Sequence, residues 1–309
     1  MNLENHRVLI TGANGFLGRA IRRQLNETFV TLLAPSSKEL DLRKRADVLD
    51  YFMSHRPSVV IHCAVQGGGI GWMKAHPVES GQDNYRMGIN VLEASHRVGT
   101  ERFVGVSSAC IYPKFCEIPF HESQIWSGFP EPTNASYALS KRAMMELGRA
   151  YYHQHGMHTS FPILANLYGP GDHLDPTRAH VVADLMIRCS QSPESLIVWG
   201  TGTPTREFIY IDDAAKGVLA CLDAPPSAFV NIGTGVETPI LELAKQVIQA
   251  HELDIPVHLD SSKPDGQPRK VLDVQSAFER LNWSADTPLE QGLRQTAQWY
   301  RAQLSLGCS

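Results

Sequence analysis

Tyr137 and Lys141 lie four positions apart and could together move a proton. In a helix, residues four apart share one face, with their Cβ atoms roughly 6 Å apart. A neighbouring ammonium favours the phenolate, so we expect Lys141 to lower the pKa of Tyr137. Such a pair can donate and accept a proton near neutral pH. The same spacing occurs by chance on exposed helices, so it indicates chemistry only together with its surroundings.

The segment around this pair is predicted to be a helix. Asn134 and Ser136 are typical of helix starts, and the residues from Ala138 to Glu146 are mostly good helix formers. The helix is expected to end near Gly156. This helix would present both side chains to whatever lies beside it.

A glycine-rich turn follows the first predicted strand, Val8–Ile10. Residues 11–18 read T-G-A-N-G-F-L-G, and apolar residues at helical spacing follow. Strand, glycine turn and helix form the context of a dinucleotide fingerprint, in which amides at the helix start face the phosphates. The spacing is G-x-x-G-x-x-G instead of the commoner G-x-G-x-x-G, and a simple tight turn is the alternative. The residues assigned to the cofactor here are Gly12, Ala13, Asn14, Gly15, Phe16, Leu17 and Gly18.

The end of the second predicted strand, Phe29–Leu33, bears on the choice of cofactor. Enzymes that use NAD usually carry a carboxylate there, which binds the ribose hydroxyls. This chain has Ser36, Ser37 and Lys38, and two hydroxyls with an ammonium suit a 2′-phosphate better. The sequence therefore predicts a preference for NADP(H), with a solvated loop ending at Glu39 as the alternative.

Two further stretches are assigned to the cofactor pocket. Asp41 and Leu42 are candidates for its adenine side. A third predicted strand, Val59–His62, leads into Ala64 and a glycine-rich loop, and small residues there let a ligand lie against the backbone. The side chain of His62 is expected to make a local structural hydrogen bond.

Composition excludes several classes of protein. The 309 residues are 43% hydrophobic and 19% charged, which is ordinary for a globular chain of one large or two smaller domains. A net charge of -4 without a basic cluster argues against nucleic-acid binding. No apolar run approaches the ~20 residues of a membrane helix, and no signal peptide is expected.

Neither the cysteines nor a group of histidines predicts a metal site. The six cysteines include no Cys-x-x-Cys pair, which favours reduced thiols in the cytoplasm. His153, His155 and His158 lie where the Tyr137 helix ends, without a Cys or carboxylate cluster. We therefore interpret them as a solvated helix end.

Several motifs together resemble the extended branch of the short-chain dehydrogenase/reductase family. They are T-G-x-x-G-x-x-G, then S-S-A-C-I-Y-P-K, then Y-x-x-x-K. Within the family, the chain is most similar to enzymes that epimerise and reduce GDP-4-keto-6-deoxy-mannose. The similarity covers nearly the whole chain in order. The further matching segments are EPTNASYALSK at 131–141, NLYGPGD at 166–172, WGTGTPTREF at 199–208 and SKPDGQPRKVLDV at 262–274.

The resemblance implies that Ser108, Tyr137 and Lys141 carry out a reduction. A hydride would reach the keto carbon, Tyr137 would protonate the resulting oxyanion, and Ser108 would donate a hydrogen bond to it. Lys141 would also hold the nicotinamide ribose. Ser108 is preferred to Ser107 because it stands four residues before Tyr112, as in the family motif.

The resemblance assigns epimerisation to Cys110 and His180. The ketone acidifies protons on its flanking carbons, and inversion needs one group to remove a proton and another to return it on the opposite face. A thiolate and an imidazole can share that work. Cys110 follows Ser108 by two residues, so we expect both side chains on the same side of an extended chain. A small buried hydrophobe and a helix cap are the respective structural alternatives.

From Asn166 onwards the chain is expected to serve the substrate. The resemblance implies that Arg188, Trp199, Arg206 and Asp265 contact a GDP-sugar. Arginines suit phosphates, an aromatic ring suits stacking, and a carboxylate suits donors on the ligand. A core tryptophan and an Arg206–Glu207 ion pair are the alternatives. Ser108 and Asn166 complete the substrate set, and Asn166, Leu167 and His180, with Lys141, complete the cofactor set.

The predicted fold is α/β, a doubly wound parallel (Rossmann) sheet with a second, smaller α/β substrate lobe. The cofactor domain is expected to comprise residues 1–165 plus about 205–233, and the interleaved substrate domain about 166–204 plus 234–309. By resemblance we expect a homodimer, in which the helix after Pro77 and the Tyr137 helix form a four-helix contact. That contact is expected to cover Val91, Leu92, Met144 and Leu147.

The expected function is conversion of GDP-4-keto-6-deoxy-mannose to GDP-L-fucose with NADPH. Epimerisation at carbons 3 and 5 would precede reduction at carbon 4. One alternative is a related enzyme for another GDP-4-keto sugar (6-deoxy or heptose), or one that only reduces. Another is a non-catalytic NADP-binding Rossmann protein, against which the intact proton-transfer residues speak. The chain departs from its relatives around Asn14 and Pro35, where they often carry arginines for the 2′-phosphate, and over Gly71–Asp83.

Overall fold

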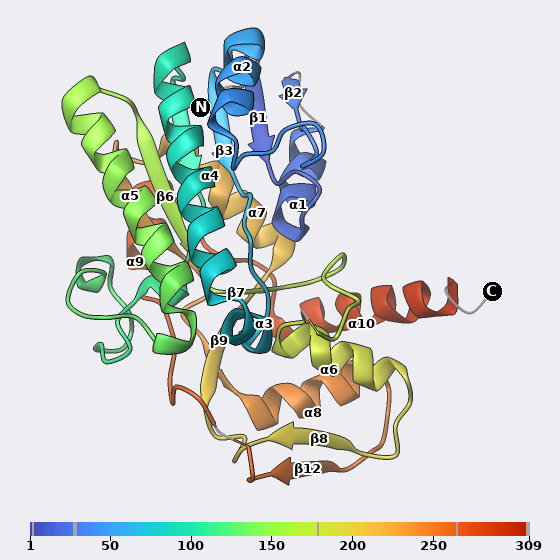
Figure 1. The fold of residues 1–309 in the computed structure, drawn as a ribbon. Helices are drawn as coiled ribbons and strands as arrows, with labels where there is room; N and C mark the ends of the chain where they lie inside the picture. The colour runs from blue at the N-terminus through green and yellow to red at the C-terminus, as the bar shows by residue number, and fades with distance from the viewer. Residues whose placement is uncertain (2, 27–29, 178, 264, 307–309) are drawn as a thin grey trace.

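A parallel sheet forms the centre of the computed structural model, which describes residues 1, 3–26, 30–177, 179–263 and 265–306 (Figure 1). Its strand order is β10-β6-β4-β3-β1-β2, and a short strand, β5 (Ser107–Ser108), also pairs with β6. The main strands are β1 (Arg7–Thr11), β2 (Thr31–Leu33), β3 (Val59–His62), β4 (Arg102–Gly105), β6 (Thr159–Leu164) and β10 (Ala228–Ile232). The predicted second strand began at Phe29, which lies outside the described residues.

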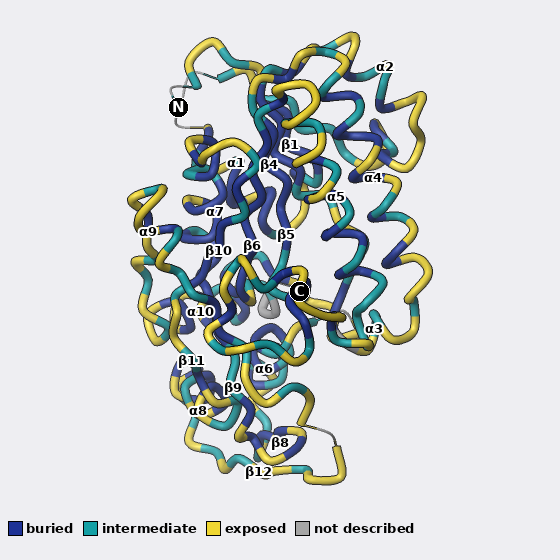
Figure 2. The backbone as a smooth tube through the Cα atoms, turned by 90° about the vertical axis from the view of Figure 1, so that its left-hand side faces the viewer, coloured by how far each residue is buried: buried dark blue, intermediate teal, exposed yellow. Residues whose placement is uncertain are grey.

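Helices cover both faces of this sheet. Figure 2 shows the buried strands between two helical layers. One layer contains α2 (Arg45–His55), α4 (Pro77–Val98) and α5 (Ala135–His155), and the other contains α1 (Phe16–Leu25), α7 (Ile211–Ala220) and α9 (Gln275–Leu281). The strands are near-continuous apolar runs because both faces are covered. The doubly wound fold is thus confirmed.

The long helices α4 and α5 pack closely against each other and against the sheet. Helix α5 ends at Gly156, which has a φ of 69°. Gly148 faces the sheet inside this helix, where a Cβ would lie 2.3 Å from Cζ of Phe161. The missing side chain therefore lets α5 approach β6, and it fixes the height of this helix above the sheet.

A second lobe has its own buried core. Leu185, Leu243 and Tyr300 are among its buried residues. It contains the three-stranded sheet β11-β9-β7 and the parallel pair β12-β8. Its elements are β7 (Asn166–Tyr168), α6 (Val181–Ser190), β8 (Leu196–Trp199), β9 (Thr205–Tyr210), β11 (Glu237–Pro239), α8 (Ile240–Ala250), β12 (Val257–Asp260) and α10 (Leu289–Leu306).

The chain passes between the two lobes several times. It leaves the large sheet after β6, returns through α7 and β10, and leaves again at β11. The stretch that contains Leu272, Ala277 and Trp283 then packs in the core of the first lobe, although the predicted boundaries assigned it to the second. Within the described residues, no helix is long and apolar enough to cross a membrane.

Candidate active site

The turn between β1 and α1 brings backbone close to backbone at two glycines. Gly12 has a φ of 70°, and a Cβ there would lie 2.7 Å from Cα of Ala64. A Cβ on Gly18 would lie 2.2 Å from the carbonyl oxygen of Gly12. Gly15 is the N-cap of α1 and has no side chain to cap the helix. Free amides at a helix start are suited to bind phosphate, so the turn fits a dinucleotide.

The first part of the loop after β2, residues 34–40, carries one carboxylate, and that group is already engaged. Glu39 accepts a hydrogen bond of 2.7 Å from the backbone N–H of Ser36. This bond lowers the pKa of Glu39. Ser37 and Lys38 are exposed beside it. The loop therefore presents hydroxyl and ammonium groups, as the sequence predicted for a 2′-phosphate.

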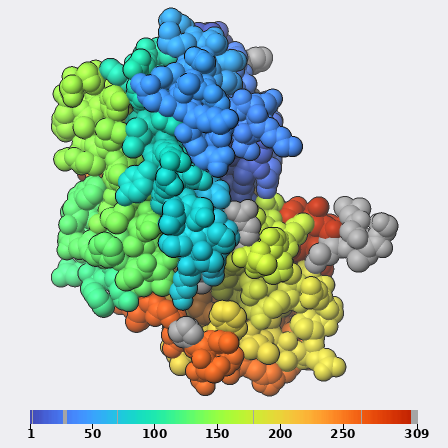
Figure 3. All heavy atoms as spheres, viewed as in Figure 1, coloured from blue at the N-terminus to red at the C-terminus, as the bar shows by residue number. Residues whose placement is uncertain are grey.

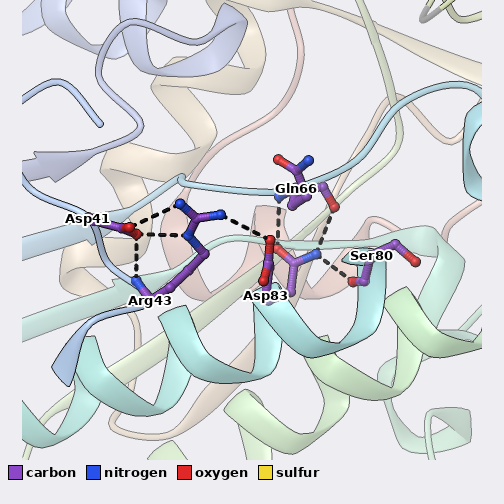
Figure 4. A network of polar contacts seen from close by, with 6 residues as sticks. Asp41, Arg43, Gln66, Ser80 and Asp83 are labelled. Atoms are coloured by element: carbon purple, nitrogen blue, oxygen red, sulfur yellow. Dashed lines mark hydrogen bonds and ion pairs between the residues drawn. The ribbon is translucent and has the colours of Figure 1, made fainter. Parts of the chain in front are cut away.

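A polar network ties the loops after β2 and β3 to helix α4 (Figure 4). Asp41 accepts two hydrogen bonds from the Arg43 guanidinium, at 2.8 and 2.9 Å, which lower the pKa of its carboxyl group. Arg43 also lies 3.5 Å from Asp83 of α4. The next residue, Asn84, donates to the backbone carbonyl of Gln66 and accepts from the backbone N–H of the same residue. Two adjacent residues of α4 thus hold the loop after β2 and the loop after β3.

Helix α5 places Tyr137 and Lys141 at the carboxyl edge of the large sheet. Tyr137 is 9% exposed and Lys141 is 4% exposed. The Lys141 ammonium lies 6.0 Å from the centre of the Tyr137 ring. It donates a hydrogen bond of 3.0 Å to the carbonyl of Val106, at the end of β4. The predicted pair is therefore adjacent, but the ammonium is held by the backbone.

The expectation that Lys141 lowers the pKa of Tyr137 is wrong for the free protein. Burial raises the pKa of Tyr137, the nearby Cys110 raises it further, and a hydrogen bond with Ser108 opposes both. Burial also lowers the pKa of Lys141 to about 8, while Cys63 opposes that shift. Tyr137 therefore stays protonated at neutral pH and is a proton donor, which suits protonation of an oxyanion.

Ser108 and Cys110 line one cavity, although not by the predicted route. Ala109–Ile111 forms a turn of 3₁₀ helix, so the expectation of an extended chain is wrong. The Cys110 N–H donates to the Ser108 hydroxyl at 3.3 Å. The polar residues around the cavity come from both lobes: Ser108, Cys110, Asn166, Glu207 and Lys270.

Glu207 and Lys270 are parts of this cavity that the sequence analysis missed. Glu207 is 2% exposed and accepts backbone N–H groups of Gly235 at 2.8 Å and Leu272 at 2.7 Å. Arg206 instead donates to backbone carbonyls, including that of Gln267 at 2.7 Å, so the alternative of an Arg206–Glu207 ion pair is wrong. Lys270 lies in the segment 262–274 that carried the resemblance, which was the available signal.

His180 lies at the start of α6 in the second lobe. It is exposed, yet desolvation by the surrounding protein lowers its pKa, while the nearby Asp172 carboxylate opposes that shift. Asp172 is 8% exposed and lines a separate cleft together with Asn14, Gly15 and Phe16. His180 therefore lies near Asp172 and is not among the residues that line the cavity with Cys110.

The residues assigned to the GDP-sugar gather around β8 and its neighbours. Trp199 is 64% exposed, so the core alternative is wrong. The Lys263 ammonium lies 5.7 Å from its ring centre. Arg188 donates to the carbonyl of Ile197 at 2.6 Å. Asp265 accepts the Thr201 backbone N–H at 2.6 Å, so its carboxylate orders the loop after β8. An exposed ring among cations is suited to a base with phosphates.

The remaining histidines have structural partners. His62 is buried, its Nδ1 lies 2.7 Å from the Thr11 hydroxyl, and burial lowers its pKa to about 3. The predicted local hydrogen bond is therefore confirmed. His155 stacks on His96 with ring centres 4.2 Å apart. In the part of the chain that the structure describes, no three His, Cys, Asp or Glu side chains gather as metal ligands.

Known proteins match the chain over most of its length. The model of the NAD dependent epimerase/dehydratase family matches residues 8–233. GDP-L-fucose synthase 1 of Arabidopsis thaliana is 36% identical over 306 residues, which cover 97% of this chain and 94% of that protein. GDP-L-fucose synthase of Escherichia coli (strain K12) is 35% identical over 313 residues, covering 96% and 97%. The crystal structure of a GDP-L-fucose synthetase from Naegleria fowleri has a TM-score of 0.89 at 27% identity, covering 99% of this chain and 95% of that one.

Proposed function

Because the chain belongs to the NAD dependent epimerase/dehydratase family, we propose that it converts GDP-4-keto-6-deoxy-mannose to GDP-L-fucose with NADPH. One observation carries this proposal. Ser108 and Cys110 share a cavity with Asn166 of the second lobe and with Lys270, beside the buried pair of Tyr137 and Lys141. A thiol there suits proton exchange beside the ketone, and a buried phenol suits protonation of the oxygen that forms on reduction.

The cofactor would bind across the carboxyl edge of the sheet. The glycine turn, Ala64 and the loops at Ser36–Lys38 and Asp41–Leu42 form its adenosine side, and Leu167 and Lys141 lie towards its nicotinamide side. When bound, NADPH supplies the hydride that reduces carbon 4. Lys141 orients the nicotinamide ribose through its ammonium. Ser108 donates a hydrogen bond to the oxygen at carbon 4, and Tyr137 gives that oxygen its proton.

Epimerisation precedes the reduction in this account. The carbon–hydrogen bond next to the ketone breaks, its proton moves to one group, and a second group returns a proton to the opposite face. Cys110 comes from the first lobe and His180 from the start of α6 in the second. An origin in different elements is compatible with transfer on opposite faces of the sugar. Arg188, Trp199, Arg206 and Asp265 would hold the GDP portion in the second lobe.

We also propose that the two lobes bind different ligands. Residues 1–165 plus about 205–233 would bind the cofactor, and about 166–204 plus 234–309 the nucleotide sugar. Leu272 and Trp283 pack in the core of the first lobe, and the same segment brings Lys270 to the cavity. This packing supports a site that both lobes build together. The free cysteines among the described residues support a cytoplasmic setting.

We also propose a homodimer through α4 and α5, which lie side by side on the face shown in Figure 3. The residues expected to meet the partner need correction. Val91, Leu92 and Met144 are 0–3% exposed, because they pack between the helices and the sheet of their own chain. Ile89, which is 46% exposed on α4, and the half-buried Leu147 of α5 are better suited to the contact.

The experiment is a reaction of the purified protein with GDP-4-keto-6-deoxy-mannose and NADPH, with the product identified by NMR. We expect stoichiometric NADPH oxidation and GDP-L-fucose. A parallel set of other GDP-4-keto sugars, including a heptose, tests the related activities. Oxidation only with another sugar would replace the proposed substrate, and no oxidation with any of them would favour a non-catalytic protein.

A further inference from the structure

Two arginines of α1 converge on Asn14, in the middle of the glycine turn. Arg22 donates from Nη1 to the side-chain carbonyl of Asn14 at 3.1 Å. Arg19 donates to the backbone carbonyl of Asn14 and, at 2.5 Å, to that of Gly171. Helical side chains lean towards the helix start, so both guanidinium groups cover the first turn of α1. Positive charge is therefore concentrated where the cofactor turn meets its helix.

Arg22 and Arg23 are adjacent in sequence but bond to different parts of the structure. Arg23 and Gln24 bond to Asp212 of α7, at 2.7 and 2.8 Å. Helix α7 packs against β6 and β10, at the opposite end of the sheet from β2. Arg22 bonds to Asn14 instead and lies on the other flank of α1. In the sheet, β2 lies at the edge farthest from β6 and β10, so the loop after β2 is on the side of α1 away from α7.

The hydrogen bond between Arg22 and Asn14 leaves a set of unused donors. Because the Asn14 carbonyl accepts from Arg22, the amide group of the same side chain is free to donate. The Nε of Arg22 is buried and has no hydrogen-bond partner among the described residues. An unpaired donor is costly, so the Arg22 side chain gains from an acceptor towards which its guanidinium can turn.

The charge of Arg22 is also uncompensated. Arg23, Arg43 and Arg45 each pair with a carboxylate, at 2.5 to 2.8 Å. Arg22 forms no such ion pair with any residue that the structure describes. The acidic residue of the neighbouring loop, Glu39, is turned to the Ser36 N–H. A phosphate dianion would supply both the negative charge and the acceptors for an unpaired guanidinium and a free amide donor.

Strand register places this group beside the selecting loop. β1 and β2 are parallel, with Leu9 opposite Leu33. The glycine turn and the loop that begins at Ala34 therefore leave neighbouring strands at the same edge. A phosphate on the adenosine ribose would lie between the two, with Lys38 on one side and Arg22 on the other.

We propose that Arg22, together with the amide of Asn14, binds the 2′-phosphate of NADP(H) and so determines the cofactor preference of this chain. The assignment rests on the proposed function, since it assumes a dinucleotide in the glycine turn. Relatives often carry an arginine around the position of Asn14. In this chain the Arg22 guanidinium reaches the same place from the second turn of α1.

The test is direct binding of NADPH and NADH to the full-length protein, by fluorescence or calorimetry. Arg22→Met is expected to weaken NADPH binding by about 10- to 100-fold, as for the loss of a charged hydrogen bond, and to leave NADH binding unchanged. Arg294→Met, at an exposed arginine of α10 that pairs with Glu290, is the control for loss of a surface charge and should change neither affinity. Adenosine 2′,5′-bisphosphate and 5′-AMP should repeat this difference without the nicotinamide half.

Asn14→Asp provides a second variant of nearly the same shape. Its carboxylate would pair with Arg22 and repel the phosphate, so we expect a loss of NADPH affinity that NADH does not share. An unchanged NADPH-to-NADH ratio in both variants would overturn the assignment of Arg22. An equal loss for both cofactors would instead show a structural role and also overturn it. Wild-type protein that binds neither cofactor would contradict the proposed function itself.

Discussion

Burial shifts the pKa values of Tyr137 and Lys141 more than neighbouring charges do. Spacing alone placed Tyr137 and Lys141 on one face, and the structure agrees. The direction of the Tyr137 shift could not be predicted, because burial depends on the residues of β5 and the 3₁₀ turn that pack around the ring. A buried, protonated phenol is suited to give a proton to an oxyanion, whereas a phenolate is not.

Replacement of Tyr137 by Phe tests this role. The variant lacks the proton donor, so the rate of NADPH oxidation is expected to fall by about 10²–10⁴-fold, as is typical for a general acid. Exchange of substrate hydrogens with deuterated water should persist, because Cys110 and His180 are unchanged. Ser107→Ala, at the buried neighbour of Ser108, is the control for disturbance nearby. Full reductase activity in the Phe variant would remove Tyr137 from the mechanism.

The ammonium of Lys141 predicts a pH dependence. Burial lowers its pKa to about 8, so the charged form is present below that pH and is lost as pH rises through it. Because kcat/KM reports groups of the free enzyme, kcat/KM for reduction is expected to decline above about pH 8. The measurement is a pH profile from 6 to 10. A profile that stays flat to pH 10 would contradict a requirement for the charged lysine.

At the scale of helices and strands, features set by the local sequence were predicted better than contacts between distant segments. The glycine turn, β3 and the helix after Pro77 were predicted correctly, because turn chemistry and periodicity act over a few residues. The face of α4 was not, since Val91 and Leu92 could have met either the sheet or a partner. Glu207 and Lys270 reach the cavity through contacts between distant segments, which no local pattern records.

The approach of α5 to the sheet predicts the effect of a methyl group at Gly148. A Cβ there would lie 2.3 Å from Phe161, so Gly148→Ala is expected to destabilise the fold by about 1–3 kcal/mol through overpacking. It should also reduce activity, because the same helix carries Tyr137 and Lys141. Gly71→Ala in α3 (Ile70–Ala75) is the control, since its Cβ would meet nothing within 4 Å. Urea unfolding curves compare the two, and equal stability would contradict the account.

At the scale of the whole molecule, the two lobes together form one site. The cavity combines Ser108 and Cys110 of the first lobe with Asn166 of the second, while the chain crosses between the lobes several times. The doubly wound fold followed from the alternation of strands and helices in the sequence. The path of the segment near Leu272 back into the first core did not, because the few residues of α9 look alike in either lobe.

The proposed dimer has a corrected interface that can be tested. Ile89→Asp places a charge on the exposed face of α4, so it is expected to convert a dimer of the wild type into a monomer. Phe278→Asp in α9 is the control, because Phe278 is 63% exposed on the other side of the sheet. Light scattering at micromolar concentration measures the mass. A wild-type monomer, or a dimer that Ile89→Asp leaves intact, would contradict this interface.

The most direct test of the combined epimerase and reductase activity is deuterium incorporation during turnover in deuterated water, read by NMR of the product. The wild type is predicted to carry deuterium at carbons 3 and 5 and hydride from NADPH at carbon 4. Cys110→Ser keeps the shape but raises the pKa of the proton-transfer group far above working pH, so incorporation at both carbons should collapse. Incorporation at the wild-type rate in that variant would contradict the account and leave a simple 4-keto reductase.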